Sequence, residues 1–375
     1  MNVSGSFSAN DERHMRRALQ LAAEAIGLSD PNPRVGCVLV GDGWVAEGHT
    51  QAAGQAHAEV MALRMARERG HALAGATAYV TLEPCAHHGR TPPCCDALIE
   101  AGLRRVVVAS GDPHPQVAGE GLRRLRAAGI EVQVGLLGDD SRELNIGFLS
   151  RIERGRPFVR LKVAGSIDGR SALDNGESRW ITGPEARADG HQWRKRAGAV
   201  LSGIGTVLAD DPRLDVRDVP TVRQPLRVIA DARLQTPPDA RLLDPPGEVL
   251  IVAASAEGPA AQALRARGAD VRAFANAQGR IDLPALILAL GDRGINELHV
   301  EAGPRLNAAL LEADLVDELL IYQAPLLIGP GRALAALPAL AQLADARRFH
   351  FIEALCVGAD LRLRARPVPR SETVR

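Results

Sequence analysis

Four side chains between residues 57 and 94 have types and an order that could perform metal chemistry. His57 and Glu59 stand two residues apart, Cys85 follows one proline and Cys94 follows another. One imidazole and two thiolates can hold Zn²⁺ tetrahedrally and leave a fourth position for water. Zinc lowers the pKa of such a water to about 7, and a nearby carboxylate that is not a ligand can move its protons. The set therefore predicts a hydrolytic zinc centre with Glu59 as the proton shuttle.

The spacing of these residues requires that they lie at helix starts. Side chains at positions i and i+2 of a helix point about 200° apart, so His57 and Glu59 can reach one site only from the first turn. Both cysteines are also expected at or near helix starts, where the helix dipole favours thiolate. The order is that of the zinc deaminase signature, H-x-E followed by P-C-x-x-C. Here, however, the eight residues AHHGRTPP separate Cys85 from Cys94.

Other residues compete for the role of third ligand. Cys95, His87 and His88 could each bind metal, and any one candidate alone could be an ordinary core or surface residue. We favour Cys94 because the run CCDALI (94–99) then matches the usual passage from the second cysteine ligand into its helix. A purely structural zinc site is disfavoured, since such sites close all four positions with Cys or His.

The elements that must position these residues alternate between strand and helix. The apolar pattern predicts a helix over 11–26 with Asn10 as its N-cap, and a hairpin at Gly41-Asp42-Gly43. Further helices are expected at about 57–69, 93–101 and 121–129, and strands at 35–40, 44–48, 76–82, 104–110 and 130–135. This alternation predicts an α/β layered domain.

Composition excludes several classes of function. The chain has 375 residues, with 45 basic and 45 acidic side chains, so charge gives no reason to expect a nucleic-acid or membrane partner. No run of apolar residues approaches the length of a membrane span. The N-terminus lacks a basic region followed by an apolar one, so we expect no secretory signal and a cytoplasmic protein. Five cysteines, three of them clustered, indicate metal or catalytic chemistry rather than disulfides.

The length suits two domains. A charged segment with Gly155 and Pro157, RIERGRP (151–157), predicts the boundary. We therefore expect a first domain over 1–151, a second over 152–367 and a polar tail over 368–375. The second domain restarts with a strand at 157–165, and apolar runs at 199–202, 226–230, 249–253 and 297–300 predict further strands of another α/β domain.

Longer strings carry a family resemblance over almost the whole chain. The N-terminal strings are NPRVGCV (32–38), HAEV (57–60), TLEPCAHHGRTPPC (81–94) and DPHPQVAGEG (112–121). The C-terminal strings are LKVAGSIDGR (161–170), GESRWITG (176–183), GTVLADDPRL (205–214) and VEAGPRLN (300–307). By these strings the chain resembles the bifunctional riboflavin biosynthesis deaminase–reductases.

The resemblance implies two consecutive reactions on a small pyrimidine ribosyl phosphate. An N-terminal domain with a cytidine deaminase-like three-layer fold would use Zn²⁺ to deaminate a diaminopyrimidinone to an aminouracil. A C-terminal domain with a dihydrofolate reductase-like fold would then reduce the ribosyl group to ribityl with NADPH. Such an enzyme is expected to be a homo-oligomer without nucleic-acid or membrane partners.

Residue roles follow from the same resemblance. The zinc ligands would be His57, Cys85 and Cys94, and the catalytic residues Glu59 and Lys162. Substrate contacts of the first domain would be Asn32, His87, His88 and Arg90. The NADPH site would contain Ala164, Trp180, Thr206, Asp210, Gly303, Pro304, Arg305, Leu306 and Asn307. The reductase substrate would meet Ser178, Arg194, Leu214, Arg217 and Glu301.

Physical chemistry supports part of the second set. Gly303-Pro304 before an apolar helix offers free backbone N–H groups to a phosphate. Arg194 and Arg217 suit bidentate binding of the substrate phosphate. The alternatives are an ordinary turn at Gly303 and solvated surface arginines. Gly203-Ile204-Gly205 is a weak signal, since it does not extend to a full G-x-G-x-x-G.

Two rival functions would share part of this zinc chemistry. A tRNA deaminase with an accessory domain would share the zinc chemistry, but zero net charge and few aromatic residues disfavour it. A non-catalytic zinc module would not need Glu59.

Lys162 and Lys195 are the two lysines in a chain with 45 basic residues. The lysine at 162 therefore suggests a position where arginine could not perform the same role, although genome bias explains such a count equally well.

Overall fold

The computed structural model describes residues 7–86, 92–113 and 119–369. The chain divides into two compact units, Met1–Gly155 and Arg156–Arg375, and each is described by itself. The boundary expected between residues 151 and 152 falls inside helix α6 (Ile146–Arg154). That helix continues to Gly155, whose φ of 68° ends it in the left-handed conformation that glycine adopts readily. Within the described part of the chain, no helix combines the length and apolar character needed to cross a membrane.

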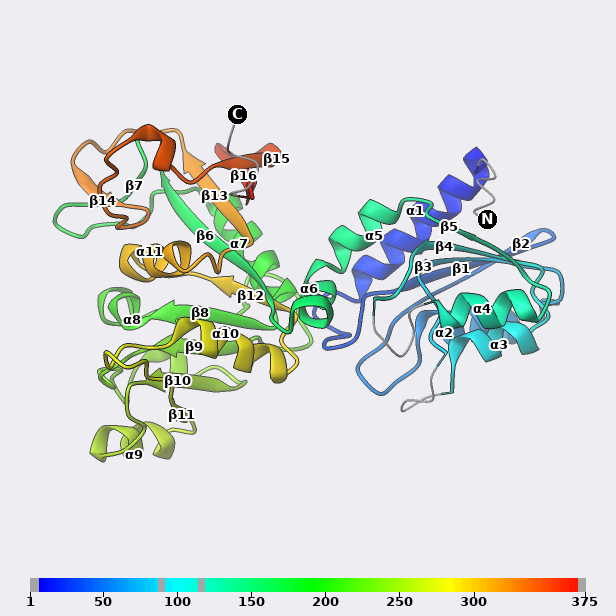
Figure 1. Ribbon diagram of the computed structural model, residues 1–375, viewed down its shortest axis with the longest axis horizontal. Coiled ribbons are helices and arrows are strands. Elements are labelled where there is room, and N and C mark those ends of the chain that lie inside the picture. Colours follow the sequence, from blue (N-terminus) through cyan, green and yellow to red (C-terminus); the bar gives the residue numbers. More distant parts are fainter. Residues whose placement is uncertain (1–6, 87–91, 114–118, 370–375) are drawn as a thin grey trace. The chain divides into compact units, whose positions relative to one another are not determined.

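The first unit is a five-stranded sheet between two helical layers (Figure 1). Its strands are β1 (Gly36–Gly41), β2 (Trp44–His49), β3 (Thr77–Leu82), β4 (Arg105–Ser110) and β5 (Glu131–Val134). Its other helices are α1 (Ala9–Glu24), α2 (Ala58–Glu68), α3 (Cys94–Glu100), α4 (Glu120–Ala127) and α5 (Gly138–Leu144). The strand order is β2-β1-β3-β4-β5, and β3, β4 and β5 are parallel.

Alternating side chains of the strands bury both faces of this sheet. Val38, Tyr79 and Val107 pack with α1 on one face, whereas Leu39, Val80 and Val108 pack with α2 and α3 on the other. Figure 1 shows α1 and α5 on one side and α2, α3 and α4 on the opposite side. The α/β layered domain expected from the strand–helix alternation is therefore observed, with the three layers that the family resemblance implies.

Local signals in the first unit agree with the structure except at one helix cap. The Asp42-Gly43 turn joins β1 to β2 as expected, with Gly41 paired to Trp44. The N-cap of α1 is Ser8, not Asn10, because the Ser8 hydroxyl accepts from the Asp11 N–H and the Asp11 carboxylate accepts from the Ser8 N–H. This reciprocal pair satisfies two backbone donors of the helix start, which a cap at Asn10 could not do.

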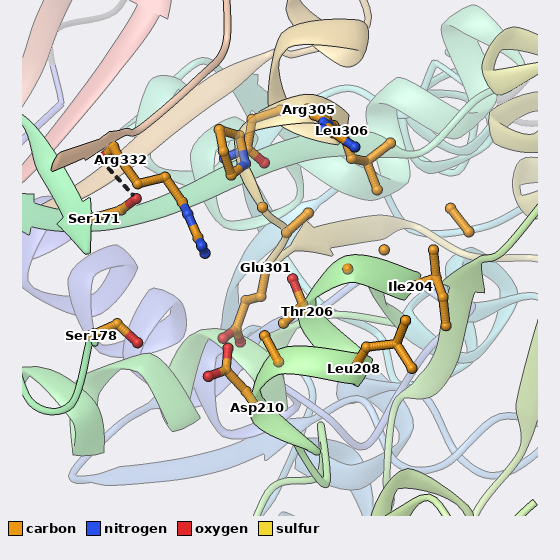
Figure 2. Close-up of a pocket in the computed structure, with 18 of the residues that line it drawn as sticks. Ser171, Ser178, Ile204, Thr206, Leu208, Asp210, Glu301, Arg305, Leu306 and Arg332 are labelled. Carbon is orange, nitrogen blue, oxygen red and sulfur yellow. Dashed lines mark hydrogen bonds between the residues drawn. The ribbon is translucent and has the colours of Figure 1, made fainter. Parts of the chain in front are cut away.

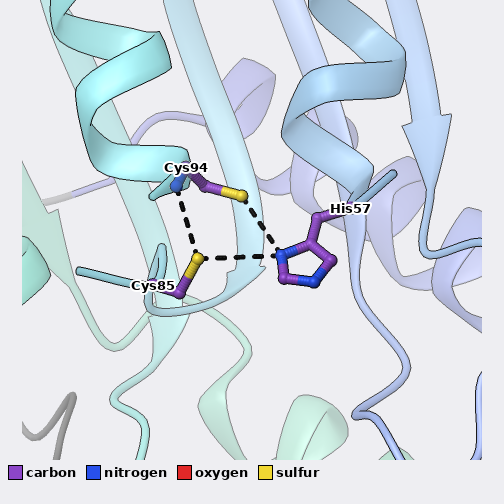
Figure 3. A group of neighbouring side chains, drawn as sticks. All are labelled: His57, Cys85 and Cys94. Atoms are coloured by element: carbon purple, nitrogen blue, oxygen red, sulfur yellow. Dashed lines mark hydrogen bonds between the residues drawn. The ribbon is translucent and has the colours of Figure 1, made fainter. Parts of the chain in front are cut away.

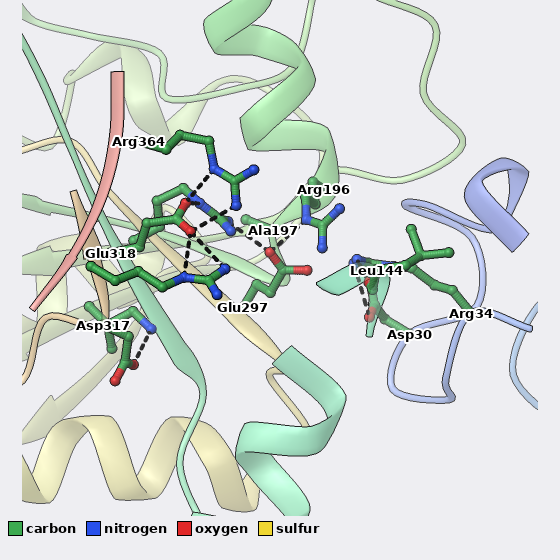
Figure 4. Close-up of polar contacts among 12 residues, drawn as sticks. Asp30, Arg34, Leu144, Arg196, Ala197, Glu297, Asp317, Glu318 and Arg364 are labelled. Carbon is green, nitrogen blue, oxygen red and sulfur yellow. Dashed lines mark hydrogen bonds and ion pairs between the residues drawn. The ribbon is translucent and has the colours of Figure 1, made fainter. Parts of the chain in front are cut away.

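Helix α5 and the start of α6 are held by a buried arginine that lies between α1 and β1. The Arg34 guanidinium donates to the Leu144 carbonyl at 3.0 Å, and Asn145 exchanges hydrogen bonds with the Arg34 backbone (Figure 4). These bonds satisfy polar groups that would otherwise be buried without partners. They fix the segment after β5, which carries no strong periodic signal in the sequence.

The second unit is built on a nine-stranded sheet of order β11-β10-β9-β8-β12-β6-β13-β16-β15. Its strands are β6 (Phe158–Ser166), β8 (Ala199–Gly203), β9 (Leu226–Ala230), β10 (Val249–Ala253), β11 (Asp270–Ala273), β12 (Glu297–Val300), β13 (Glu318–Ala324), β15 (Phe349–Val357) and β16 (Asp360–Pro367). The strands from β11 to β13 are mutually parallel, and β16 and β15 add an antiparallel hairpin. A separate ribbon pairs β7 (Arg170–Leu173) with β14 (Gly331–Ala333).

Helices cover both faces of the parallel part of this sheet. They are α7 (Pro184–Arg196), α8 (Ile204–Asp210), α9 (Pro259–Ala266), α10 (Leu283–Asp292) and α11 (Pro304–Glu312), with short 3₁₀ turns at Arg241–Leu243 and Leu343–Asp345. Leu286 of α10 and Leu310 of α11 pack on one face, whereas Leu264 of α9 packs on the other. Because the strands are parallel, their carboxyl ends meet at one edge, where open α/β sheets bind ligands.

A buried ion-pair network joins the centre of this sheet (Figure 4). Arg160 of β6 donates to Glu297 of β12 at 2.7 Å and to Glu318 of β13 at 2.6 Å. Glu318 also accepts from Arg364 of β16 at 2.8 Å. Both carboxylates and Arg160 are almost fully buried, so loss of one partner would leave an uncompensated charge in the core.

Candidate functional site

The structure brings His57, Cys85 and Cys94 together in the first unit, with one ligand atom of each within 4.8 Å of the others (Figure 3). The Cys94 sulfur lies 3.3 Å from His57 Nδ1, and the Cys85 sulfur lies 3.7 Å from the same nitrogen. The Cys94 N–H donates to the Cys85 sulfur at 3.3 Å. Among the described residues, this is the one cluster of three or more His, Cys, Asp or Glu side chains with metal-site spacing.

Two helix starts create this geometry. His57 is the N-cap of α2, and Cys94 is the first residue of α3. Helix α2 approaches β2 closely at Gly48, where an added Cβ would lie 2.4 Å from the Ala58 carbonyl oxygen. The tight packing of α2 on the sheet therefore places its first turn, with His57 and Glu59, opposite Cys85 and Cys94.

Glu59 is buried beside the cluster, with 3% of its surface exposed. Burial raises the pKa of its carboxyl to about 7, and the Cys85 thiolate adds to this rise. The Cys94 thiol and then the His57 ring donate to Cys85, which lowers the pKa of the Cys85 thiol well below its usual range. A carboxyl group that exchanges protons near neutrality, next to a thiolate and an imidazole, is the arrangement a proton shuttle needs.

Cys95 is not a member of the cluster. Its side chain is fully buried in the apolar core of the first unit, and its sulfur lies 3.5 Å from Asp96 Oδ1. Burial raises the pKa of the Cys95 thiol to about 12. These surroundings oppose thiolate formation and disfavour Cys95 as a ligand.

Sequence reasoning missed the role of Glu83, which precedes Pro84-Cys85. Its buried carboxylate accepts hydrogen bonds from the backbone N–H groups of Gly119, Gly121 and Leu122 at 3.1, 3.0 and 3.3 Å. Glu83 thereby ties the start of α4 to the segment that carries Cys85, which lies two residues after Glu83. Its place in the TLEPC string was the available signal, but the partners lie about 36 residues further along the chain.

The expected substrate residues of the first unit are partly described. Asn32 lies half-buried in the turn between α1 and β1, where its N–H donates to the Ser29 carbonyl. His87, His88 and Arg90 lie outside the described residues.

In the second unit, a pocket of about 810 Å³ opens at the carboxyl ends of the parallel strands (Figure 2). Its volume lies within the usual range for ligand sites. The expected residues that line it are Lys162, Ala164, Ser178, Thr206, Asp210, Glu301, Gly303, Pro304, Arg305, Leu306 and Asn307. Residues that sequence reasoning missed also line it, among them Ser171, Arg233, Gln235 and Arg332.

Strand register places Lys162 and Glu301 side by side. Leu161 of β6 pairs with Val300 of β12, so the residues that follow them are level. Burial lowers the pKa of the Lys162 ammonium, and the Glu301 carboxylate opposes that shift. The ammonium also lies 5.7 Å from the centre of the Tyr322 ring. The pocket lining thus holds the Lys162 ammonium and the Glu301 carboxylate at level positions of neighbouring strands.

Arg194 binds the carboxylate of Glu301. Its guanidinium donates to both oxygens of Glu301, at 2.5 and 2.9 Å, and to the Asp215 carbonyl. Burial raises the pKa of Glu301, but the ion pair with Arg194 more than offsets this, so that the pKa lies well below its usual range. In this structure the Arg194 guanidinium is paired with Glu301. To bind the substrate phosphate as suggested, Arg194 would have to exchange that partner for the phosphate.

Three other expected residues lie outside the pocket lining. Trp180 is 68% exposed, with the Arg187 guanidinium 4.5 Å from its ring centre. Leu214 is buried in the core of the second unit. Arg217 is half-exposed and donates to the Asp215 carboxylate at 2.8 Å.

Comparison with known proteins matches both units. Residues 8–110 match the family model for the cytidine and deoxycytidylate deaminase zinc-binding region, and residues 157–361 match the model for the RibD C-terminal domain. Riboflavin biosynthesis protein RibD of Escherichia coli K12 is 48% identical, over 94% of this chain and 98% of its own length. The corresponding Haemophilus influenzae protein is 45% identical, over 96% of this chain and 98% of its own.

Solved structures agree along almost the whole chain. Acinetobacter baumannii RibD, form 1, matches with a TM-score of 0.87 at 42% identity, covering 96% of this chain and 99% of that one. A Thermotoga maritima diaminohydroxyphosphoribosylaminopyrimidine deaminase/5-amino-6-(5-phosphoribosylamino)uracil reductase matches with a TM-score of 0.86 at 34% identity, with the same coverage.

These matches confirm the cytidine deaminase-like fold of the first unit and the reductase fold of the second. The tRNA deaminase alternative is not favoured, because the matched second domain is a RibD reductase domain rather than an accessory module. The chain belongs to the RibD family, the bifunctional enzymes of riboflavin biosynthesis in which a deaminase domain precedes a reductase domain.

Proposed function

We propose that the first unit hydrolytically deaminates 2,5-diamino-6-ribosylamino-4(3H)-pyrimidinone 5′-phosphate. The second unit then reduces the ribosyl group with NADPH to give 5-amino-6-ribitylaminouracil 5′-phosphate. The observation that carries the proposal is the buried Glu59 beside the cluster of His57, Cys85 and Cys94, on a chain whose second unit holds Lys162 and Glu301 in a ligand-sized pocket.

The donor set of the first unit fits zinc. One imidazole and two thiols converge in a partly buried position, and three protein ligands are the number found in catalytic zinc sites, where water takes the fourth position. Zinc held by His57, Cys85 and Cys94 would supply a water acidic enough to attack at neutral pH. Glu59 would take a proton from that water and pass protons to the pyrimidine ring nitrogen and to the departing ammonia.

The pocket of the second unit fits a dinucleotide and a sugar. The N–H groups at the start of α11, beside Gly303 and Pro304, would bind the cofactor diphosphate. NADPH would supply the two electrons and one hydrogen of the reduction. Lys162, oriented by Glu301, would hold or deliver a proton at the ribosyl oxygen as the sugar carbon is reduced.

Replacing Cys94 by serine is expected to strip the zinc, which should otherwise be present at about one ion per chain. A serine hydroxyl does not ionise near neutrality, and it would replace the sulfur that lies 3.3 Å from His57 Nδ1. Cys95→Ser is the matched control, because that side chain faces the core. If the adjacent thiol were the true ligand, metal analysis of the two purified variants would show zinc kept in Cys94→Ser and lost in Cys95→Ser.

The remaining partner assignments rest on surface features. We infer that the protein acts in the cytoplasm as a homo-oligomer, without nucleic-acid or membrane partners. Edge strand β15 exposes Phe351, Ile352 and Leu355, and exposed apolar side chains on an unpaired edge favour association with another chain. Zero net charge gives no electrostatic attraction to polyanions.

Product analysis tests the proposed function directly. Purified protein is incubated with the diaminopyrimidinone, with and without NADPH, and the products are identified by mass. Without NADPH we expect one amino group to be replaced by oxygen and no further change. With NADPH the product should gain two hydrogens. Unchanged substrate in the presence of zinc-loaded protein would refute the deaminase assignment, and an oxidised cofactor without a reduced product would refute the reductase assignment.

A further inference from the structure

The pocket of the second unit runs across four strand ends, and its far end carries an arginine. In the sheet, β6, β12, β8 and β9 are successive neighbours, and residues that follow each of them, or lie near its end, line the pocket. Lys162 belongs to β6, whereas Arg233 lies three residues after β9. Three strand spacings separate these strands, or about 14 Å. A ligand that reaches from one residue to the other must be long, as a dinucleotide is.

The order of chemical groups along this pocket follows from its fixed points. Lys162 and Glu301 mark the place where the sugar is reduced, so the nicotinamide lies there. The start of α11, which follows β12, marks the diphosphate. The adenosine half is then left for the region of β8 and β9. This placement rests on the proposed function of the second unit as an NADPH-dependent reductase.

The acidic residue that follows β9, Asp231, is buried outside the pocket lining and therefore does not bind the adenosine ribose. Nicotinamide enzymes that use NAD often place a carboxylate at such a strand end to bind the ribose 2′-hydroxyl, whereas an arginine there accommodates a 2′-phosphate. Asp231 is fully buried, and its carboxylate accepts from the Thr236 N–H at 2.7 Å and from the Thr236 hydroxyl at 2.8 Å. Its role is to close the turn after β9, and it does not line the pocket.

Arg233, two residues later, has the opposite surroundings. It lines the pocket, is exposed, and has no hydrogen bond or ion pair with any described residue. Its guanidinium is therefore available to a ligand. We propose that Arg233 binds the 2′-phosphate of the cofactor adenosine and is the side chain that selects NADPH over NADH.

Two other arginines line the pocket but lie elsewhere along it. Arg332 of β14 is near Ser171, and its guanidinium lies 3.6 Å from the position that a Cβ of Gly176 would take (Figure 2). Arg305 is in the first turn of α11, next to the diphosphate position. Both are exposed, so they are matched in charge and accessibility to Arg233. From their positions, Arg332 and Arg305 would contact either the substrate or the parts of the cofactor that are the same in NADPH and NADH.

Binding of two adenosine nucleotides separates these roles. The full-length protein is titrated with adenosine 2′,5′-bisphosphate and with adenosine 5′-monophosphate. We expect Arg233→Ala to weaken binding of the bisphosphate at least about tenfold and to leave the monophosphate within about twofold, because a charge-assisted arginine–phosphate contact is lost. Preference for NADPH over NADH in the reductase reaction should fall by the same factor. Arg305→Ala should weaken both nucleotides alike.

Each other outcome has a defined meaning. Unchanged bisphosphate affinity in Arg233→Ala, or a selective loss in Arg305→Ala instead, overturns the assignment of Arg233 and leaves the reductase proposal intact. A wild-type protein that binds neither the bisphosphate nor NADPH, yet still deaminates, overturns the NADPH assignment and this inference with it. Retained binding of adenosine 5′-monophosphate verifies that the second unit of Arg233→Ala is folded, since Arg233 is exposed and lies in that unit, whereas deamination reports only on the first unit.

Discussion

Replacing Glu59 by glutamine is expected to lower the rate of deamination at least about a hundredfold, the usual contribution of a positioned general acid–base group. The amide keeps the size and burial of the carboxylate but cannot accept the water proton or pass it on. Because Glu59 is not one of the three clustered ligand residues, the variant should keep its zinc. The measurement is the deamination rate of zinc-loaded variant and wild type, with metal content determined on the same samples.

The same variant provides an internal control in the second unit. Glu59→Gln protein should reduce the deaminated intermediate with NADPH at the wild-type rate, because Lys162, Glu301 and the pocket lie in a separate compact unit. A folded Glu59→Gln protein that deaminates normally would show that another group carries the protons. A folded variant that has lost reduction would contradict the independence of the two sites.

Replacing Lys162 by arginine should lower reductase turnover at least about tenfold, or roughly 1.4 kcal/mol of transition-state stabilisation. The ammonium is half-buried beside Glu301 and over the Tyr322 ring, where a broader guanidinium could not take the same position without displacing its neighbours. Deamination and folding should persist, because the positive charge is kept and the change lies in the second unit.

Lys195→Arg is the matched control for Lys162→Arg. Lys195 lies in the last turn of α7, outside the pocket lining, and should tolerate arginine with little effect on turnover. Steady-state reduction of the deaminated intermediate by the two variants makes the comparison. Wild-type rates in both would mean that the scarcity of lysine reflects genome bias alone.

The clustering of His57, Cys85 and Cys94 could be predicted from sequence because its information is largely local. His57 and Glu59 share one helix start and Cys94 begins another, so two short strings specify most of the geometry. Cys85 was also expected at or near a helix start, but it lies three residues after β3 and in no helix. Strands β1 to β5 lie where the apolar runs predicted them, since each is short and bounded by turn residues. The choice between Cys94 and Cys95 needed the direction of α3, which the run CCDALI suggested.

The rest depended on contacts between distant segments. Arg194 looked like a free phosphate ligand, yet Glu301, 107 residues later, accepts hydrogen bonds from its Nε and Nη2. Helix α6 extends past the expected domain boundary because its capping glycine, not the charged run, ends it. The antiparallel hairpin of β15 and β16 carries arginines whose burial depends on Glu318 of another strand, which no local pattern reveals.

The two sites also differ in when they can form as the chain is synthesised. All three clustered ligand residues have been synthesised once residue 94 has been added, and the last strand of the surrounding sheet ends at Val134. The reductase pocket instead needs β6 to pair with β12 and β13, and its lining extends to Leu334. Because domains tend to fold as units from the N-terminus during synthesis, the first unit can enclose its metal while the ribosome is still making the second. Zinc supply would then act on the nascent chain, whereas NADPH could influence folding only after synthesis is nearly complete.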